Sequence, residues 1–235
     1  MKIFCKDISE IKWQQTPSFI LNKSIHIWLA HVQTDPRLIS ELKKSLSEDE
    51  LRRSDRFAFE KDRNQFITAH VTVRTILAKY VDTTPAQIQF KKTAYRKPFI
   101  SQPLTMIKFN ISHSENKILI AVAENEIGVD IEKVKDSFEF NQLSKTYFSE
   151  KEQREIATSA NQKETFYKFW TRKESVLKAT GMGITDNLKE IEICNDENYS
   201  KLFPENIYIS SFKIEEDFFG SIASLSNRPA LFFKT

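Results

Sequence analysis

The sequence predicts an α+β fold of two similar αβ halves related by a pseudo-two-fold, each a small antiparallel sheet packed on one long helix. Residues 62–81 and 163–180 carry apolar side chains at the spacing of one helix face. Residues 24–32, 107–132 and 189–233 contain short segments with the two-residue period of strands. With 235 residues and no linker rich in Gly, Ser or Pro, the chain can bury a sizeable core.

In the first half, residues 24–32 read as a strand. Ser47 can cap a helix, because Glu50 follows three residues later in the capping-box position. The helix at 62–81 then presents one apolar stripe, formed by Phe66, Ala69, Val73, Ile76, Leu77 and Tyr80.

The second half begins with a strand at 107–114 that we expect to run into a polar loop around His113. The segment 117–132 reads as a hairpin, with the turn at residues 124–126. Ser149 and Glu152 form a second capping box at the start of a helix over 149–158. Gly181 ends the helix at 163–180, and short strands fill the remainder.

The two long helices align with each other. Residues 66–80 set against 166–180 match Phe66 with Phe166 and Leu77 with Leu177, and they place Arg74 opposite Glu174. Chance similarity of two amphipathic helices is the alternative. We divide the chain into an N-terminal half, 1–105, and a C-terminal half, 106–235.

Charge separates the two halves as well. Residues 1–109 carry a net charge of +8 and residues 110–235 carry −5, within a total of +3. Taken alone, this asymmetry indicates uneven surface charge, and the alternative is an anionic ligand on one side and a cation on the other.

Several classes of protein are disfavoured. No apolar run approaches the length of a membrane span, and the first residues lack the apolar core of a secretory signal. The two cysteines, Cys5 and Cys194, have no motif spacing, so we expect a reducing, cytoplasmic setting without a cysteine metal site.

The stretch "IGVDIE" at 127–132 sets two carboxylates one residue apart. In a strand, Asp130 and Glu132 point to one face, and Val129 and Ile131 point to the other. Gly128 leaves space that we expect a ligand to approach. A solvated strand face is the alternative explanation.

A third carboxylate strengthens the metal interpretation. Glu174 lies at the edge of the buried stripe of the second long helix, with Lys178 one turn further on. Three crowded carboxylates raise each other's pKa, and all-oxygen ligands suit Mg²⁺. A simple Glu–Lys pair on the helix is the alternative. His113, between Ser112 and Ser114, is suited to a phosphate.

Three motifs together resemble those of the 4′-phosphopantetheinyl transferases: "FNISHS", "IGVDIE" and "FWTRKESVLKATGMGI". The resemblance covers about residues 45–185, and the length is similar to the monomeric, surfactin-synthetase-activating branch. It implies transfer of the 4′-phosphopantetheine arm of coenzyme A to a serine of an apo acyl or peptidyl carrier protein, with release of 3′,5′-ADP.

The resemblance also implies residue roles. Asp130, Glu132 and Glu174 would hold Mg²⁺ against the pyrophosphate, and Lys178 would bind a phosphate oxygen. Ser112 and His113 would contact the 3′-phosphoadenosine part of coenzyme A. The base that takes the serine proton is Glu152 or Glu174, and the capping box explains Glu152 equally well.

The basic half would then hold the coenzyme A phosphates, with Arg53, Arg56, Arg63 and Lys97 as candidates. Arg96 stands where the family has glycine, and Gln65 stands where a well-known member has an arginine. We expect a monomer that binds neither nucleic acid nor membrane. The alternatives are a non-catalytic coenzyme A or nucleotide binder of the same fold and a nucleic-acid-binding protein.

Overall fold

The structure is a computed structural model that describes residues 2–135, 137, 139–182, 186–194, 197–200, 202 and 204–235. Its elements in chain order are β1 (Lys2–Ile8), β2 (Ile25–His31), α1 (Pro36–Lys43), α2 (Glu48–Ser54), α3 (Glu60–Tyr80), η1 (Pro85–Gln87), β3 (Gln89–Lys92), β4 (Pro98–Gln102), β5 (Lys108–Ser114), β6 (Lys117–Ala123), β7 (Ile127–Lys133), α4 (Asn141–Tyr147), α5 (Glu150–Thr158), α6 (Gln162–Thr180), η2 (Asp186–Glu190), β8 (Glu197–Tyr199), β9 (Ile207–Ile214), β10 (Phe218–Ser224) and β11 (Ala230–Lys234).

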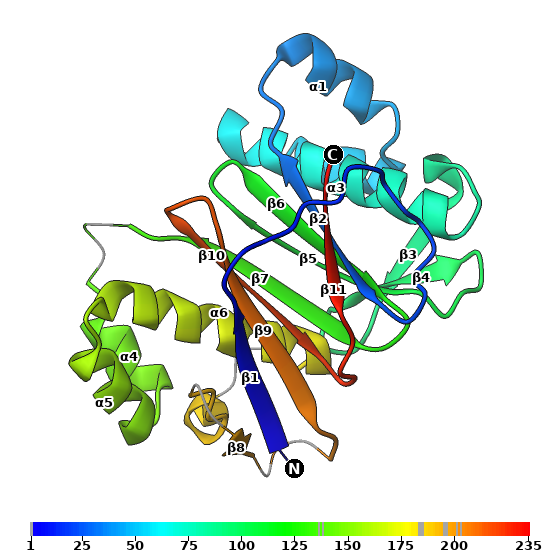
Figure 1. Ribbon diagram of the computed structural model, residues 1–235. Coiled ribbons are helices and arrows are strands. Elements are labelled where there is room, and N and C mark those ends of the chain that lie inside the picture. Colours follow the sequence, from blue (N-terminus) through cyan, green and yellow to red (C-terminus); the bar gives the residue numbers. More distant parts are fainter. Residues whose placement is uncertain are drawn as a thin grey trace.

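Two large sheets, a small sheet of β3 and β4 and two long helices make an α+β fold, as predicted (Figure 1). One sheet has the strand order β11-β2-β6-β5, and α3 packs on it through Ala69, Val73 and Leu77. The other has the order β7-β10-β9-β1-β8, and α6 packs on it through Phe166 and Phe169. A third apolar cluster, which includes side chains of β2, β6, β7 and β10, fills the space between the two sheets.

The two halves repeat one arrangement. The series β2, α3, β5, β6 has the same chain order as β7, α6, β9, β10, and the strands pair as β2-β6-β5 and β7-β10-β9. All four of these pairings are antiparallel. The similarity of the two long helices therefore extends to the sheets on which they pack.

The ends of the chain depart from a purely antiparallel arrangement. β1 joins the sheet of α6 parallel to β9, and β11 joins the sheet of α3 parallel to β2. β5 and β6, which follow residue 105, pair with β2 rather than with β7. The boundary between the two sheets therefore does not coincide with the predicted division of the chain at 105/106.

Two expectations about strands were wrong. Residues 117–132 are not a hairpin: β6 pairs with β5 and β2, whereas β7 pairs with β10. His113 does not lie in a loop, because β5 continues to Ser114. The two-residue period identifies strands, but it fixes neither the residues at which they end nor the strands with which they pair.

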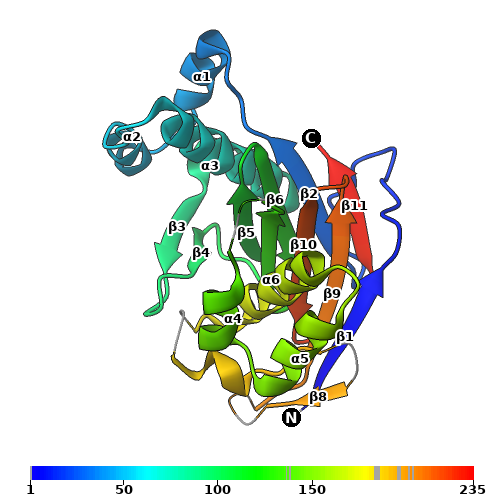
Figure 2. The same ribbon diagram turned by 90° about the vertical axis from the view of Figure 1, so that its left-hand side faces the viewer.

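The predicted helix ends are confirmed. Ser47 with Glu50 and Ser149 with Glu152 form complete capping boxes, and Gly181 ends α6 in the left-handed conformation at φ 73°. Figure 2 shows α1–α3 at one end and α4–α6 at the other, with β3 and β4 projecting beside α3. Among the helices described, none is long and apolar enough to cross a membrane.

Candidate active site

The alternation of β7 divides its side chains between two environments. Ile127, Val129 and Ile131 belong to the cluster between the sheets. Gly128, Asp130 and Glu132 therefore face α6. At Gly128 a Cβ would lie 2.0 Å from the Ser175 carbonyl oxygen, so this glycine serves the close packing of α6 on β7. The expectation that a ligand approaches there was wrong.

Asp130 is the centre of the site. It is buried, with 3% of its surface exposed, and its Oδ1 accepts hydrogen bonds from Ser112 Oγ at 2.8 Å and from Lys178 Nζ at 2.6 Å. Lys178 Nζ also lies 3.0 Å from Ser112 Oγ. The other oxygen, Oδ2, is buried without a hydrogen-bond partner. Such an orphaned acceptor is rare in a folded protein and is typical of a site completed by a ligand or ion.

Glu132 and Glu174 share this environment. Burial, followed by the charge of Asp130, raises the pKa of Glu132 to about 7. The same two causes raise the pKa of Glu174. The predicted carboxylates therefore act on one another, as like charges do in a partly desolvated site. Among the residues described, however, no three His, Cys, Asp or Glu side chains converge into a ready-made metal site.

The site lies on a seam between the two sheets, where the edge strands β5 and β7 meet. Asn110 Oδ1 accepts the Val129 backbone N–H at 2.9 Å. Ser114 Oγ accepts the Lys133 backbone N–H and donates to Glu132 Oε2, both at 3.1 Å. Neither Asn110 nor Ser114 was assigned to the site from the sequence. Applying the strand period to β5 would have found both, because they share a face with Ser112.

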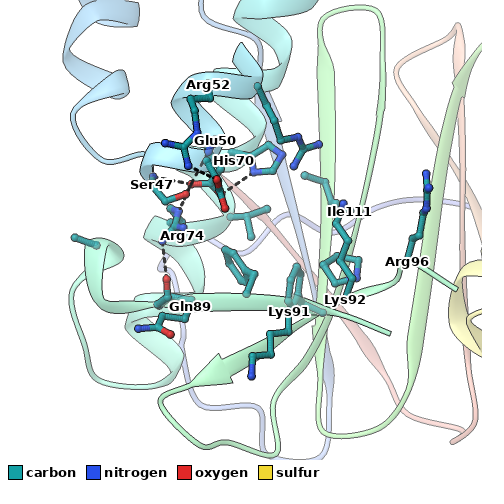
Figure 3. Close-up of a pocket in the computed structure, with 18 of the residues that line it drawn as sticks. Ser47, Glu50, Arg52, His70, Arg74, Gln89, Lys91, Lys92, Arg96 and Ile111 are labelled. Atoms are coloured by element: carbon teal, nitrogen blue, oxygen red, sulfur yellow. Dashed lines mark hydrogen bonds and ion pairs between the residues drawn. The ribbon is translucent and has the colours of Figure 1, made fainter. Parts of the chain in front are cut away.

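A separate cleft of about 960 Å³ lies between α2, α3, β3, β4 and β5 (Figure 3). Its cationic lining residues are Arg52, Arg53, Arg56, Arg74, Lys91, Lys92 and Arg96. The basic character predicted for the first half is thus concentrated on one concave surface, although the sequence pointed to only Arg53 and Arg56 of these residues as candidates to bind the coenzyme A phosphates.

One buried acid lies at the side of this cleft. Glu50 accepts hydrogen bonds from Ser47, from His70 Nδ1 at 2.9 Å and from Arg74 Nε at 2.9 Å. Burial alone would raise the pKa of Glu50, but these hydrogen bonds outweigh it and lower the pKa to about 2. Glu50 thus neutralises part of the cationic lining and fixes α2 against α3.

Two further cations predicted to bind phosphate lie outside this cleft. Arg63 is half-buried and is not part of its lining. Lys97 Nζ contacts Glu126 Oε2 at 2.6 Å, the Ala179 carbonyl oxygen at 2.8 Å and the Ile127 carbonyl oxygen at 3.2 Å. Lys97 therefore ties the turn after β3 to the end of α6.

The two departures from the family pattern have structural explanations. Arg96 adopts φ 65°, the left-handed conformation that glycine takes without strain, and it keeps the turn with an N–H bond to the Thr93 carbonyl. Gln65 Nε2 donates to the Glu115 carbonyl oxygen at 2.9 Å, in the turn that joins β5 to β6.

His113 lies between the cleft and the carboxylates. Its side chain is exposed, and Phe109 and Ile111, at alternate positions of the same strand, line the cleft. Partial desolvation, followed by the charge of Lys178, lowers the pKa of His113, and Asp130 and the cleft residue His70 also influence it. Ser112, in contrast, points to Asp130.

Glu152 occupies a different place. It is fully buried, and its oxygens accept the Ser149 N–H at 2.7 Å, the Ile193 N–H at 3.0 Å and Lys173 Nζ at 2.9 Å. Lys173 in turn donates to the carbonyl oxygens of Leu188 and Ile191. Of the two interpretations drawn from the sequence, this geometry favours the structural one.

Comparison with known proteins identifies the family. Residues 126–218 match the family described as the 4′-phosphopantetheinyl transferase superfamily, and residues 34–125 match the N-terminal region of 4′-phosphopantetheinyl transferases. The 4′-phosphopantetheinyl transferase HetI of Nostoc sp. is 34% identical over 180 residues, which cover 74% of this chain and 75% of HetI.

Two further relatives give the same result. A putative 4′-phosphopantetheinyl transferase of Synechocystis sp. is 35% identical over 179 residues, covering 74% of this chain and 71% of the relative. The 4′-phosphopantetheinyl transferase Sfp of Bacillus subtilis is 28% identical over 178 residues, covering 72% and 78%. The chain therefore belongs to the 4′-phosphopantetheinyl transferase superfamily and is an enzyme of that class.

Proposed function

We propose that the enzyme transfers the 4′-phosphopantetheine arm of coenzyme A to a serine of an apo acyl or peptidyl carrier protein and releases 3′,5′-ADP. The observation that carries this proposal is the cluster of Asp130, Lys178 and Ser112 within hydrogen-bond distance, with Glu132 and Glu174 coupled to it. The relatives' names and the cationic cleft beside the cluster support it.

The reaction balances without any further reactant. The carrier serine oxygen attacks the phosphorus that bears the pantetheine arm, forming one P–O bond. The P–O bond to the bridging oxygen breaks, and 3′,5′-ADP leaves with that oxygen. The serine proton passes to a base, so positioning and charge stabilisation are the main tasks of the protein.

Two features of the carboxylates support a divalent cation, although the described residues do not form a ready-made group of three ligands. Asp130 Oδ2 is a buried acceptor without a partner, and burial followed by the charge of Asp130 raises the pKa values of Glu132 and Glu174. Asp130, Glu132 and Glu174 would hold Mg²⁺, a choice that suits an all-oxygen donor set. When bound, Mg²⁺ would stabilise charge on the pyrophosphate.

The chain's own cations would bind the remaining phosphate charge. Lys178 already lies at the carboxylates, and it would contact a pyrophosphate oxygen. His113, between the cluster and the cleft, would contact the 3′-phosphoadenosine part, and the cleft cations, including Arg53 and Arg96, would hold its phosphate. Arg63 and Lys97 lie outside the cleft, so we assign them a lesser part.

For the base, we favour Glu174 over Glu152. Glu174 is half-buried beside Asp130, within the cluster assigned to the pyrophosphate. Glu152 is fully buried with both oxygens occupied.

We further propose a cytoplasmic monomer of the surfactin-synthetase-activating type, and we place carrier docking at residues 134–150. Of that stretch, residues 136 and 138 lie outside the described part of the chain.

A mass measurement tests the proposed function. The protein is mixed with an apo carrier protein, coenzyme A and Mg²⁺, and the carrier should gain the mass of one phosphopantetheinyl group. Asp130→Asn, which keeps the side-chain volume, should reduce the transfer rate by about 100-fold or more while circular dichroism remains unchanged. A carrier that gains no mass with any divalent metal would overturn the proposal.

A further inference from the structure

We infer that Asn110 and Ser114 are positioning residues, which set the register of the β5–β7 seam so that Ser112 meets Asp130. The inference rests on the proposed function, because it concerns the site assigned there.

The seam has an unusual construction. β5 is an edge strand of one sheet and β7 is an edge strand of the other, so the two are not joined by a backbone ladder. Side chains of β5 take the place of the ladder, since Asn110 accepts the Val129 N–H and Ser114 accepts the Lys133 N–H. Backbone donors on a strand edge need such partners when they are buried.

The contacts keep one register along the seam. The bonds from Asn110 to Val129, from Ser112 to Asp130 and from Ser114 to Lys133 join residues separated by 19, 18 and 19 positions. A slip by one residue would turn Asp130 away from Ser112, because strand side chains alternate between faces. Asn110 and Ser114 thus bracket the Ser112–Asp130 contact on both sides.

Burial makes the loss of these contacts costly. Asn110 is 5% exposed, Ser114 is 9% exposed, and Val129 is fully buried. A buried hydrogen bond from a side-chain amide oxygen to a backbone N–H holds the strand more tightly than an exposed hydrogen bond does, because water cannot take the place of the buried acceptor. The two halves of the molecule are therefore aligned at the residues that carry the site.

The test compares variants that keep or remove the acceptors. Asn110→Leu removes the acceptor at similar volume, and Asn110→Asp keeps it. Ser114→Ala removes the hydroxyl, and Ser114→Thr restores it. Ile76→Ala, a buried change on α3 away from the seam, serves as a control for lost stability.

We expect Asn110→Leu and Ser114→Ala to lower kcat by about 10- to 100-fold with KM for coenzyme A within about twofold. The affinity of the substrate-free protein for Mn²⁺ should weaken at least about threefold. The loss of the electron paramagnetic resonance signal of free Mn²⁺ measures this affinity. Asn110→Asp and Ser114→Thr should recover most of the kcat and most of the Mn²⁺ affinity. Ile76→Ala should lower the Tm without changing kcat or Mn²⁺ affinity.

The inference is overturned if Asn110→Leu and Ser114→Ala, at equal loss of Tm, change kcat and Mn²⁺ affinity no more than Ile76→Ala does. If Asn110→Leu does not fold, the Ser114 pair decides. Failure of the wild-type enzyme to transfer phosphopantetheine would instead overturn the proposed function, so the two failures are distinct.

Discussion

At the scale of single residues, Arg96 in the cationic cleft supplies a positive charge but adopts a strained backbone conformation. Arg96 holds a left-handed backbone, at φ 65°, that costs a non-glycine residue about 1 kcal/mol. Arg96→Gly should therefore raise the free energy of unfolding by about 0.5–1 kcal/mol and weaken coenzyme A binding by removing a cation.

Arg96→Ala separates these two effects, because alanine loses the charge and keeps the strain. Urea denaturation should show no gain for alanine, while titration with coenzyme A should show the same weakening for both variants. Equal stabilisation by glycine and alanine would contradict the explanation.

The second residue-scale prediction concerns pH. The pKa of Glu50 is about 2 in the folded protein, below the ordinary value of 4.5. The stabilisation from its ionised form is therefore present above pH 4.5 and is lost as the pH falls toward 2. Between pH 5 and pH 3, Glu50→Gln should lose less stability than the wild type does, by about 1–2 kcal/mol. Chemical denaturation at each pH measures this, and parallel pH profiles would show that Glu50 is not responsible.

Glu152 permits a clear separation of structural and catalytic roles. Glu152→Gln leaves Lys173 as a buried charge without its carboxylate and should cost about 3–5 kcal/mol. The double variant Glu152→Gln with Lys173→Met removes both charges and should recover stability and transfer activity together. A double variant that folds but does not transfer would identify Glu152 as the base.

At the scale of elements, the contact of β7 with α6 determines the geometry of the site. β7 carries Asp130 and Glu132, and α6 carries Glu174 and Lys178, so their spacing depends on how closely strand and helix approach. Gly128 permits that approach, because a Cβ there would lie 2.0 Å from the Ser175 carbonyl oxygen and 2.3 Å from the Ala179 nitrogen.

Gly128→Ala should therefore destabilise the protein by about 3 kcal/mol or more, because backbone atoms cannot move aside, and transfer should fall in proportion to the fraction of protein that remains folded. Gly220→Ala on β10 is the matched comparison, since its Cβ would meet a side chain, the Phe212 ring, rather than backbone atoms. Thermal unfolding of both variants compares them. A Gly128→Ala variant as stable as Gly220→Ala would show that α6 is not held by this contact.

At the scale of the whole molecule, periodicity was sufficient to predict the two long helices and the face of β7 that bears the carboxylates, and local cap motifs predicted the starts of α2 and α5 and the end of α6. It could not predict that β6 pairs with β5 and β2, or that β1 and β11 each join a distant part of the chain. Pairing depends on contacts between segments that local patterns do not encode. For the same reason the β5–β7 seam and most of the cationic cleft emerged only from the structure.

These long-range pairings imply that the two halves unfold together. β11 lies in the sheet of α3, yet Phe232 belongs to the cluster between the sheets, and Phe233 stacks on Trp28 at 4.6 Å. Phe233→Leu should cost about 1–2 kcal/mol. The apolar cluster between the sheets connects the two halves, and so do β1 and β11, each of which joins a distant part of the chain. The loss of stability should therefore be detected at Trp170 on α6 as well as at Trp28 on β2.

Fluorine NMR of protein labelled with 5-fluorotryptophan gives one probe for each of the 3 tryptophans. The urea midpoints at Trp28 and Trp170 should fall by the same amount in Phe233→Leu, and also in Phe166→Leu, a matched change in the cluster of α6. A midpoint at Trp170 that does not move with Phe233→Leu would mean that the two halves are separate folding units. The site would then depend on docking of two preformed halves, because Ser112 and Asp130 come from different sheets.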